Sequence, residues 1–161
     1  MPVTVAVNFM SVVHQSSGGM SMAFPDVCKT PSPAGPIPIP YPNVAMSSDT
    51  AMGSSTVKMD GNPIMLKDSN FKMSSGDEAG SAGGGVASNT IKGKAEFVNF
   101  SFDVKVDGKN VPRMLDPMIH NKQSSPNTPP FPELQGPVVV VVPDETTNVE
   151  RKCPCCEEAL E

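Results

Sequence analysis

The side chains best suited to hold a metal ion in this 161-residue chain are two histidines and four cysteines. His14 and His120 each follow an apolar segment and precede a turn, and Cys28 lies between them in the sequence. Ligands drawn from such distant segments would cross-link long loops, which suits a small domain with little core. The residues leave an alternative open, in which the histidines are ordinary turn residues and Cys28 is a small buried hydrophobe.

A second group of thiols lies near the end of the chain, at Cys153, Cys155 and Cys156. Thiolates this close together bind soft metals or oxidise. A zinc knuckle needs two separated pairs of ligands, and the second pair is missing, so a self-contained knuckle is not expected. One of these thiols could still supply the fourth ligand of a site completed elsewhere.

The residue pattern gives little support to catalysis. Cys28 and either histidine are formally a nucleophile and its base, but no catalytic signature surrounds Cys28 and its flanks are rich in proline. The acidic residues, including Glu78, Glu96 and Glu133, are scattered and form no pair with acid and base roles. We therefore predict that the chain is not an enzyme.

The composition predicts an all-β fold. The chain has 18 prolines and 13 glycines, which break helices, and only 38 % hydrophobic residues with no Trp. We expect short strands, many turns and a small core. The net charge is −5 and no basic patch contains aromatic residues, so binding to nucleic acid is not expected. Residues 1–48 hold only two charged side chains, so this stretch either packs on another protein or forms uncharged polar loops.

Four segments carry a local structural signal. Residues 3–13 and 95–107 alternate apolar and polar residues and are predicted to be strands. Residues 25–42 are rich in proline and must be extended, and the apolar residues between the prolines favour a strap across a core over a linker or SH3-type ligand. Residues 74–93 are rich in Ser and Gly but lack the ending of a phosphate-binding loop, so we predict an exposed loop.

The chain contains an internal repeat. Both copies place an Asp-Gly pair between two apolar segments, which is a strong signal for a tight β-hairpin. The copies are Val57-Lys-Met-Asp-Gly-Asn-Pro-Ile64 and Val104-Lys-Val-Asp-Gly-Lys-Asn-Val111. The expected architecture is a small pseudo-repeated β-hairpin cone with irregular Pro/Gly-rich loops.

The composition changes after Asn121, which divides the chain into a domain at residues 1–121 and an extension at 122–161. The extension begins with a Pro-rich linker or wrap, continues with a strand at Val138–Val142, and ends in the cysteine tail. The valine run is too short to span a membrane. No Lys or Arg precedes Lys29, so a secretory signal is not expected and the chain should be made as a soluble cytoplasmic protein.

Several stretches resemble the PAAR-like domain family found with type VI secretion systems, together over roughly residues 8–121. The most specific are His14-Gln-Ser-Ser-Gly-Gly-Met-Ser21, Phe24-Pro-Asp-Val-Cys28, Pro36-Ile-Pro-Ile-Pro-Tyr-Pro-Asn43 and Val111-Pro-Arg-Met-Leu-Asp-Pro-Met-Ile-His-Asn121. The resemblance implies a non-catalytic spike tip that caps the trimeric VgrG spike as a monomer, sharpens it for membrane puncture and carries effector or chaperone cargo. Such a protein is cytoplasmic until the system fires, and it is then secreted or delivered into the target cell.

The resemblance also implies a zinc ion held by histidines and a cysteine. Carried onto this chain, the ligands are His14, Cys28 and His120. With two histidines in the whole chain, a three-histidine site is impossible, so the fourth ligand is a tail cysteine, a carboxylate or absent.

Two other interpretations remain open at this stage. One is the delivery domain of a toxin whose catalytic part is absent, and the other is an unrelated zinc-binding interaction module. Only about 40 residues follow the domain, which is few for a toxin fold and favours a free-standing tip.

Overall fold

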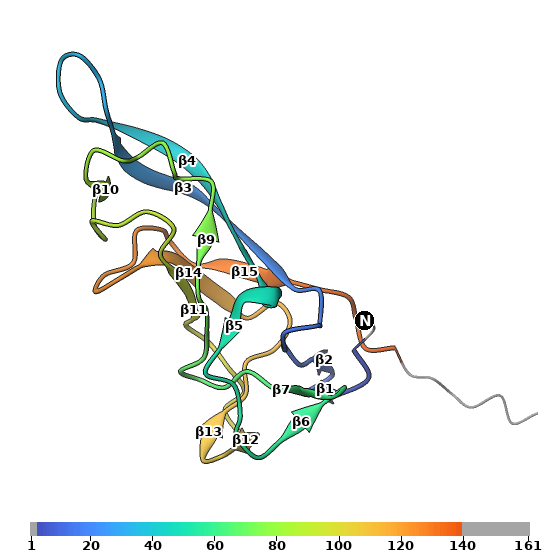
Figure 1. Ribbon diagram of the computed structural model, residues 1–161. Coiled ribbons are helices and arrows are strands. Elements are labelled where there is room, and N and C mark those ends of the chain that lie inside the picture. The colour runs from blue at the N-terminus through green and yellow to red at the C-terminus, as the bar shows by residue number, and fades with distance from the viewer. Residues whose placement is uncertain (1–2, 140–161) are drawn as a thin grey trace, which may run out of the picture.

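The computed structural model describes residues 3–139, which form fifteen strands, most of them short, and one 3-10 turn, η1 (Ser47–Asp49). The prediction of an all-β fold is confirmed. The domain is elongated, with a long hairpin projecting at one end and several two-residue hairpins gathered at the other (Figure 1). No helix in the described part of the chain is long and apolar enough to cross a membrane.

The long hairpin consists of β3 (Met20–Thr30) and β4 (Ile37–Met46), which pair antiparallel with a register shift between Ala23 and Asp26. Successive backbone N–H groups of a strand point to opposite edges, and Pro38, Pro40 and Pro42 have none. The residues between them must therefore supply the donors to β3, and the prolines face the other edge. That edge cannot accept a further strand along 37–42.

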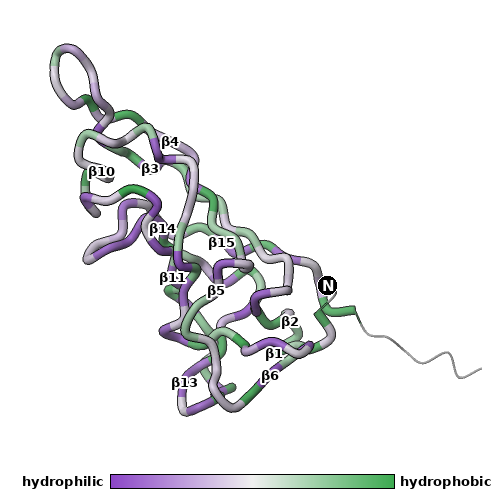
Figure 2. Tube along the Cα trace, viewed as in Figure 1, coloured by the Kyte–Doolittle hydropathy of each residue, from purple (hydrophilic) through white to green (hydrophobic). Residues whose placement is uncertain are grey.

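The prediction of a strap across a core was therefore wrong in one respect. The proline run is extended, as expected, but it is a paired strand, and the side chain of Ile37 is exposed. Ile39 and Tyr41 are half-buried and lie opposite Cys28 and Asp26 of β3. The loop between the two strands carries only uncharged residues and is pale in Figure 2, whereas stretches of both strands beside it are green.

The long hairpin belongs to the main sheet, whose strand order is β5-β8-β11-β14-β15-β3-β4-β9, with β10 paired to β3. The remaining strands of this sheet are β5 (Thr50–Ala51), β8 (Asn70–Phe71), β9 (Ser74–Ser75), β10 (Gly84–Gly85), β11 (Lys94–Phe97), β14 (Pro117–Lys122) and β15 (Phe131–Leu134). Its core contains Phe71 and Phe97, whose rings meet edge to face at 6.1 Å, together with Val13, Met65 and Met118.

Three two-residue hairpins lie at the opposite end of the molecule (Figure 1). They are β1 (Ala6–Val7) with β2 (Met10–Ser11), β6 (Lys58–Met59) with β7 (Asn62–Pro63), and β12 (Lys105–Val106) with β13 (Lys109–Asn110). In every hairpin both turn residues have positive φ, as a type I′ turn requires. The two predicted copies of the repeat are confirmed, and the structure adds a third at residues 5–12.

Two of the strand predictions fail at this end of the domain. Residues 3–13 are a hairpin rather than one strand, because the chain reverses at Asn8 and Phe9 (φ 51° and 65°). Residues 95–107 are split between β11 and β12. The chain leaves the sheet after Phe97. Further on, the Ser101 N–H donates to the Val111 carbonyl, and Phe102 is turned out into solvent.

The three hairpins share one apolar core. Equivalent positions of the repeat contribute equivalent side chains, and the residues that end each copy, Val12, Ile64 and Val111, are all completely buried. Partly buried residues from the first strand of each copy pack against this core. They are Val5, Val57, Met59, Val104 and Val106. No hairpin could bury this surface alone, so the three stabilise one another.

Side-chain hydrogen bonds close the three hairpins into a ring. Each bond joins the turn of one hairpin to the residue that precedes another: Asp60 with Thr4, Asp107 with Thr56, and Asn8 with Asp103. The hydroxyls of Thr56 and Ser54 lower the pKa of Asp107 to about 2, so it accepts these bonds as a carboxylate. The ring has an approximate threefold arrangement within one chain.

The chain beyond residue 121 continues to pack on the domain. β15 is inserted between β14 and β3, and the Val139 N–H donates to the Val3 carbonyl near the ring. The predicted boundary at residues 121 and 122 stays a prediction. Most of the predicted valine strand, from Val140 onward, and the thiols of Cys153, Cys155 and Cys156 lie outside the described residues.

Candidate functional site

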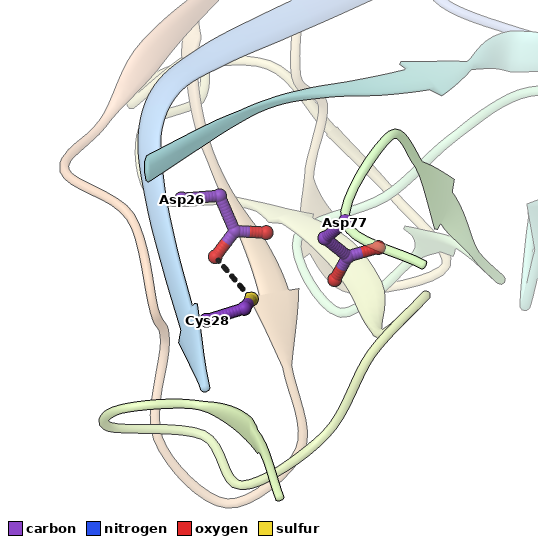
Figure 3. Close-up of side chains that lie close together, drawn as sticks. All are labelled: Asp26, Cys28 and Asp77. Atoms are coloured by element: carbon purple, nitrogen blue, oxygen red, sulfur yellow. Dashed lines mark hydrogen bonds between the residues drawn. The ribbon is translucent and has the colours of Figure 1, made fainter. Parts of the chain in front are cut away.

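A buried cluster of metal-binding side chains lies beside the inner face of β3. Asp26 and Cys28 alternate along this strand, so both point inward, and Asp77 approaches them from the turn after β9 (Figure 3). All three are completely buried, and their ligand atoms lie within 4.8 Å of one another. Within residues 3–139, no other group of three or more His, Cys, Asp and Glu side chains meets that spacing.

The Asp26 carboxylate is surrounded by amide donors. The side-chain amides of Asn43, Asn121 and Asn127 all direct an N–H group at its oxygens. The orientation of Asn127 is fixed by its other contacts, because its oxygen accepts from Ala87 at 2.8 Å and its nitrogen donates to the Val27 carbonyl at 2.9 Å. These bonds replace the water that a buried carboxylate loses.

Burial shifts the other two members of the cluster toward their neutral forms. It raises the pKa of Asp77 to about 6, although both carboxylate oxygens accept the Lys92 N–H at 3.1 Å. Burial, reinforced by the negative charges of Asp26 and Asp77, raises the pKa of the Cys28 thiol to about 12. In the absence of a cation, Cys28 is therefore a protonated and unreactive thiol at neutral pH.

The Gly-rich segment predicted to be an exposed loop covers this cluster. Its residue Gly80 packs on Cys28 so closely that an added Cβ would lie 2.3 Å from the Cys28 Cβ. β10, from the same segment, pairs with β3 at Cys28 and Lys29. The absence of side chains at these glycines lets the backbone reach the buried strand, so the loop is partly buried and closes the site.

The structure does not bring the three predicted ligands together. His14 lies next to the hairpin ring, bridged to Ile64, with its Nε2 atom 3.4 Å from Asp60. His120 lies on β14, with its Nε2 atom 2.9 Å from the Ser21 hydroxyl. Burial lowers the pKa of both imidazoles, that of His120 to about 4, so both are neutral at pH 7. Only Cys28 belongs to the cluster, and the predicted ligand set remains a prediction without support from this geometry.

Two members of the cluster, Asp26 and Asp77, were not predicted from the sequence. The Asp26-x-Cys28 spacing was visible, and in a strand it places both side chains on one face. Asp77 carried no such signal, because its approach depends on how the Gly-rich segment folds back over β3.

Comparison with known proteins identifies the family. The sequence model of the toxin PAAR-like domain matches residues 19–127. The chain belongs to this PAAR-like family. It is also 43 % identical over 143 residues to the DNase toxin Tse7 of Pseudomonas aeruginosa, an alignment that covers 84 % of this chain and 37 % of Tse7. The chain thus spans well under half the length of that relative. No solved structure matches.

The relative corrects one prediction. We expected that the chain is not an enzyme, and its similarity to a protein named as a DNase toxin contradicts that expectation. The error has an identifiable cause. The expectation rested on residue spacing within one chain, whereas the correction rests on similarity to a named relative, which residue spacing does not reveal.

The protonation of Cys28 can be tested by its reactivity. In a variant with Ser at positions 153, 155 and 156, Cys28 should react with a disulfide reagent at pH 7.5 at least 100-fold more slowly in the folded protein than in denaturant, because burial suppresses its thiolate. The rate is followed by absorbance. A folded-state rate within tenfold of the denatured one would show that the thiol is exposed or ionised.

Proposed function

We propose that this domain docks on the trimeric spike of a type VI secretion system and delivers a DNA-cleaving toxin into a target cell. Membership of the toxin PAAR-like family and the similarity to a DNase toxin support the proposal. The observation that carries the docking part is the ring of three equivalent hairpins at one end of the domain.

A trimeric spike presents three identical surfaces around its axis. One chain can contact all three in the same way only if it has three similar surfaces of its own. The hairpins β1–β2, β6–β7 and β12–β13 supply them, with the same type I′ turn and the same pattern of ring contacts. With the ring on the spike, the β3–β4 hairpin points away from it and forms the tip that meets the target membrane first (Figure 1).

Two exposed aromatic residues support docking through the ring. The side chain of Phe9 is fully exposed, and its φ of 65° is rare for a bulky residue, whereas the other two hairpins carry Gly61 and Gly108 at this position. Phe102 is 84 % exposed and lies beside Asp103, the ring partner of Asn8. Neither phenylalanine side chain contributes to the core, and aromatic residues often anchor protein interfaces.

Binding to the spike tests the docking proposal. Purified chain and trimeric spike protein should form a complex of one chain per trimer, measured by native mass spectrometry. The variant Phe9→Gly combined with Phe102→Ser should weaken binding by roughly tenfold or more while leaving the fold intact, because glycine relaxes the turn. Val86→Ser, which removes an exposed apolar side chain from the Gly-rich loop, is the matched control. Another stoichiometry, or no complex at all, would reject the proposal.

We further propose that zinc, which the family resemblance implies, is held by Cys28 with Asp26 and Asp77. The donors suit zinc, which takes sulfur and carboxylate oxygen ligands. A bound zinc would balance the negative charge of the three buried acidic groups. It would also cross-link β3 to the Gly-rich segment. The ligand must be a thiolate, so binding would release the Cys28 proton.

The metal content of purified variants distinguishes the two ligand sets. In a background with Ser at positions 153, 155 and 156, Cys28→Ala, Asp26→Asn and Asp77→Asn should each lose zinc by elemental mass spectrometry. His14→Ala and His120→Ala should retain it. Loss of zinc only in Cys28→Ala, His14→Ala and His120→Ala would favour the ligand set predicted from the sequence. Unchanged zinc in every variant would reject both ligand sets, and so would a lack of zinc in the background protein.

We also propose that the protein which contains this chain cleaves DNA. The similarity to a DNase toxin supports this proposal. The net charge of −5 belongs to this chain, which aligns with only 37 % of that toxin, so it does not argue against a DNA substrate for a longer protein. The protein at its natural length should convert supercoiled plasmid to nicked or linear forms in a buffer that contains Mg²⁺, as followed by gel electrophoresis. Plasmid that stays supercoiled would reject nuclease activity without bearing on spike docking.

A further inference from the structure

Glu133 of β15 is a completely buried carboxyl group, and neither of its oxygens has a hydrogen-bond partner. Two residues further along, the side-chain oxygen of Gln135 is also buried without a partner. Within residues 3–139, these three oxygens are half of the six buried side-chain polar atoms that lack one. Such groups are costly, so their concentration at one place needs an explanation.

The oxygens of Glu133 and Gln135 crowd over the same glycine. A Cβ added at Gly19 would lie 1.9 Å from Glu133 Oε1 and 3.1 Å from Gln135 Oε1. The Gln135 side chain cannot simply be turned around, because its nitrogen donates to Ser11 Oγ and to the Val12 carbonyl, both at 2.8 Å. An acceptor oxygen is therefore fixed close to the Glu133 carboxyl.

No cation pairs with Glu133 in the part of the chain that the structure describes. The charged and titratable groups on the neighbouring elements are already engaged: Arg113 with Asp116, His120 with Ser21, Lys122 with Glu96, and Asp26 with the three amides. Burial first, and the negative charge of Asp116 second, raise the pKa of Glu133 to about 8. Both effects disfavour the carboxylate.

We propose that the Glu133 carboxyl binds a proton in the folded protein and uses it as a latch that holds the segment after β15 on the domain. The protonated carboxyl donates its O–H to Gln135 Oε1, which gives both groups a partner. Loss of the proton leaves a buried carboxylate facing an amide oxygen, with Asp116 nearby, and each of these contacts is repulsive. One carboxylate and one amide supply too few ligands for a divalent cation.

The latch acts where residues 131–139 contact both the main sheet and the hairpin ring. The backbone of Glu133 bonds to the carbonyl of Asp116 and the N–H of Leu115, and β15 pairs with β3 at Ser21. Beyond Gln135, the Gly136 carbonyl accepts from Ser11 in the first hairpin of the ring. Deprotonation therefore weakens the attachment of residues 131–139 to the sheet and the ring together. This inference does not depend on spike docking.

The pH dependence of stability tests the latch. A carboxyl whose pKa is higher in the folded state than its ordinary value of 4.5 makes the folded state bind more protons, so stability falls as pH rises and levels off above about 8. Between pH 6.5 and 7.5 Glu133 alone should raise the unfolding equilibrium constant roughly tenfold. His14 and His120 oppose this by up to about twofold each, because their pKa values are lowered by folding and they bind protons in this window only in the unfolded chain. The wild type should therefore show a net rise of roughly twofold to threefold. This window lies above the pKa of Asp77 and well below that of Cys28.

The variant Glu133→Gln should lose the rise, because its amide N–H donates to Gln135 at every pH. Its unfolding constant should instead fall slightly over this window, through the two histidines that remain. Asp68→Asn, at an exposed carboxylate paired with Lys109, should keep the wild-type rise and is the control. Denaturant titrations at each pH provide the constants. An equal slope in the wild type and Glu133→Gln would overturn the proposal.

A direct titration keeps the proposal testable if a variant misfolds. The ¹³C resonance of the Glu133 carboxyl in the wild-type protein should titrate with a midpoint near pH 8. Above that pH, the amide of Leu115 should lose protection from hydrogen exchange in the wild type but not in Glu133→Gln. A carboxyl midpoint below pH 6 would show that Glu133 is ionised at neutral pH and would overturn the latch.

Discussion

The hydrogen bond from each hairpin turn to the start of another hairpin is the interaction on which the ring end of the domain depends. A two-residue hairpin is unstable alone in water, and the described chain contains three of them. The type I′ turn directs the side chain of its first residue outward, where it can bond to Thr4, Thr56 or Asp103. Because the three bonds close a ring, the apolar residues beneath it form one core rather than three exposed edges.

The ring was only partly predictable from the sequence. The Asp-Gly pairs of the second and third hairpins are strong local signals, and both hairpins are present. The first hairpin carries Asn8 and Phe9 in its turn, and a bulky residue at positive φ is one that sequence rules advise against. The alternation of residues 95–107 misled for a different reason: it continues through a bend where Ser101 bonds to another segment, and periodicity does not detect bends.

The buried cluster shows the same limit. Asp26 and Cys28 share a strand, so their common face follows from spacing alone. Asp77 and the asparagines reach Asp26 from distant parts of the chain, and their meeting depends on the strand order, which no local pattern encodes. The two histidines suit a metal by residue type, but in the structure they are neutral buried groups, and His120 lies against a serine hydroxyl.

A chain with few large apolar residues must bury polar ones, and the described part buries more polar than apolar side chains. Each buried acid is neutralised or solvated differently: Asp26 by amides, Asp77 by a backbone N–H, and Asp116 by Arg113. Glu133 has none of these partners, and a proton is the smallest group that can replace them. Hydrogen bonds require particular distances and angles, whereas apolar contacts are non-directional, so polar side chains fix much of the geometry of this domain. The stability of the domain must therefore depend on pH, because folding raises the pKa values of two of its buried acids, Asp77 and Glu133.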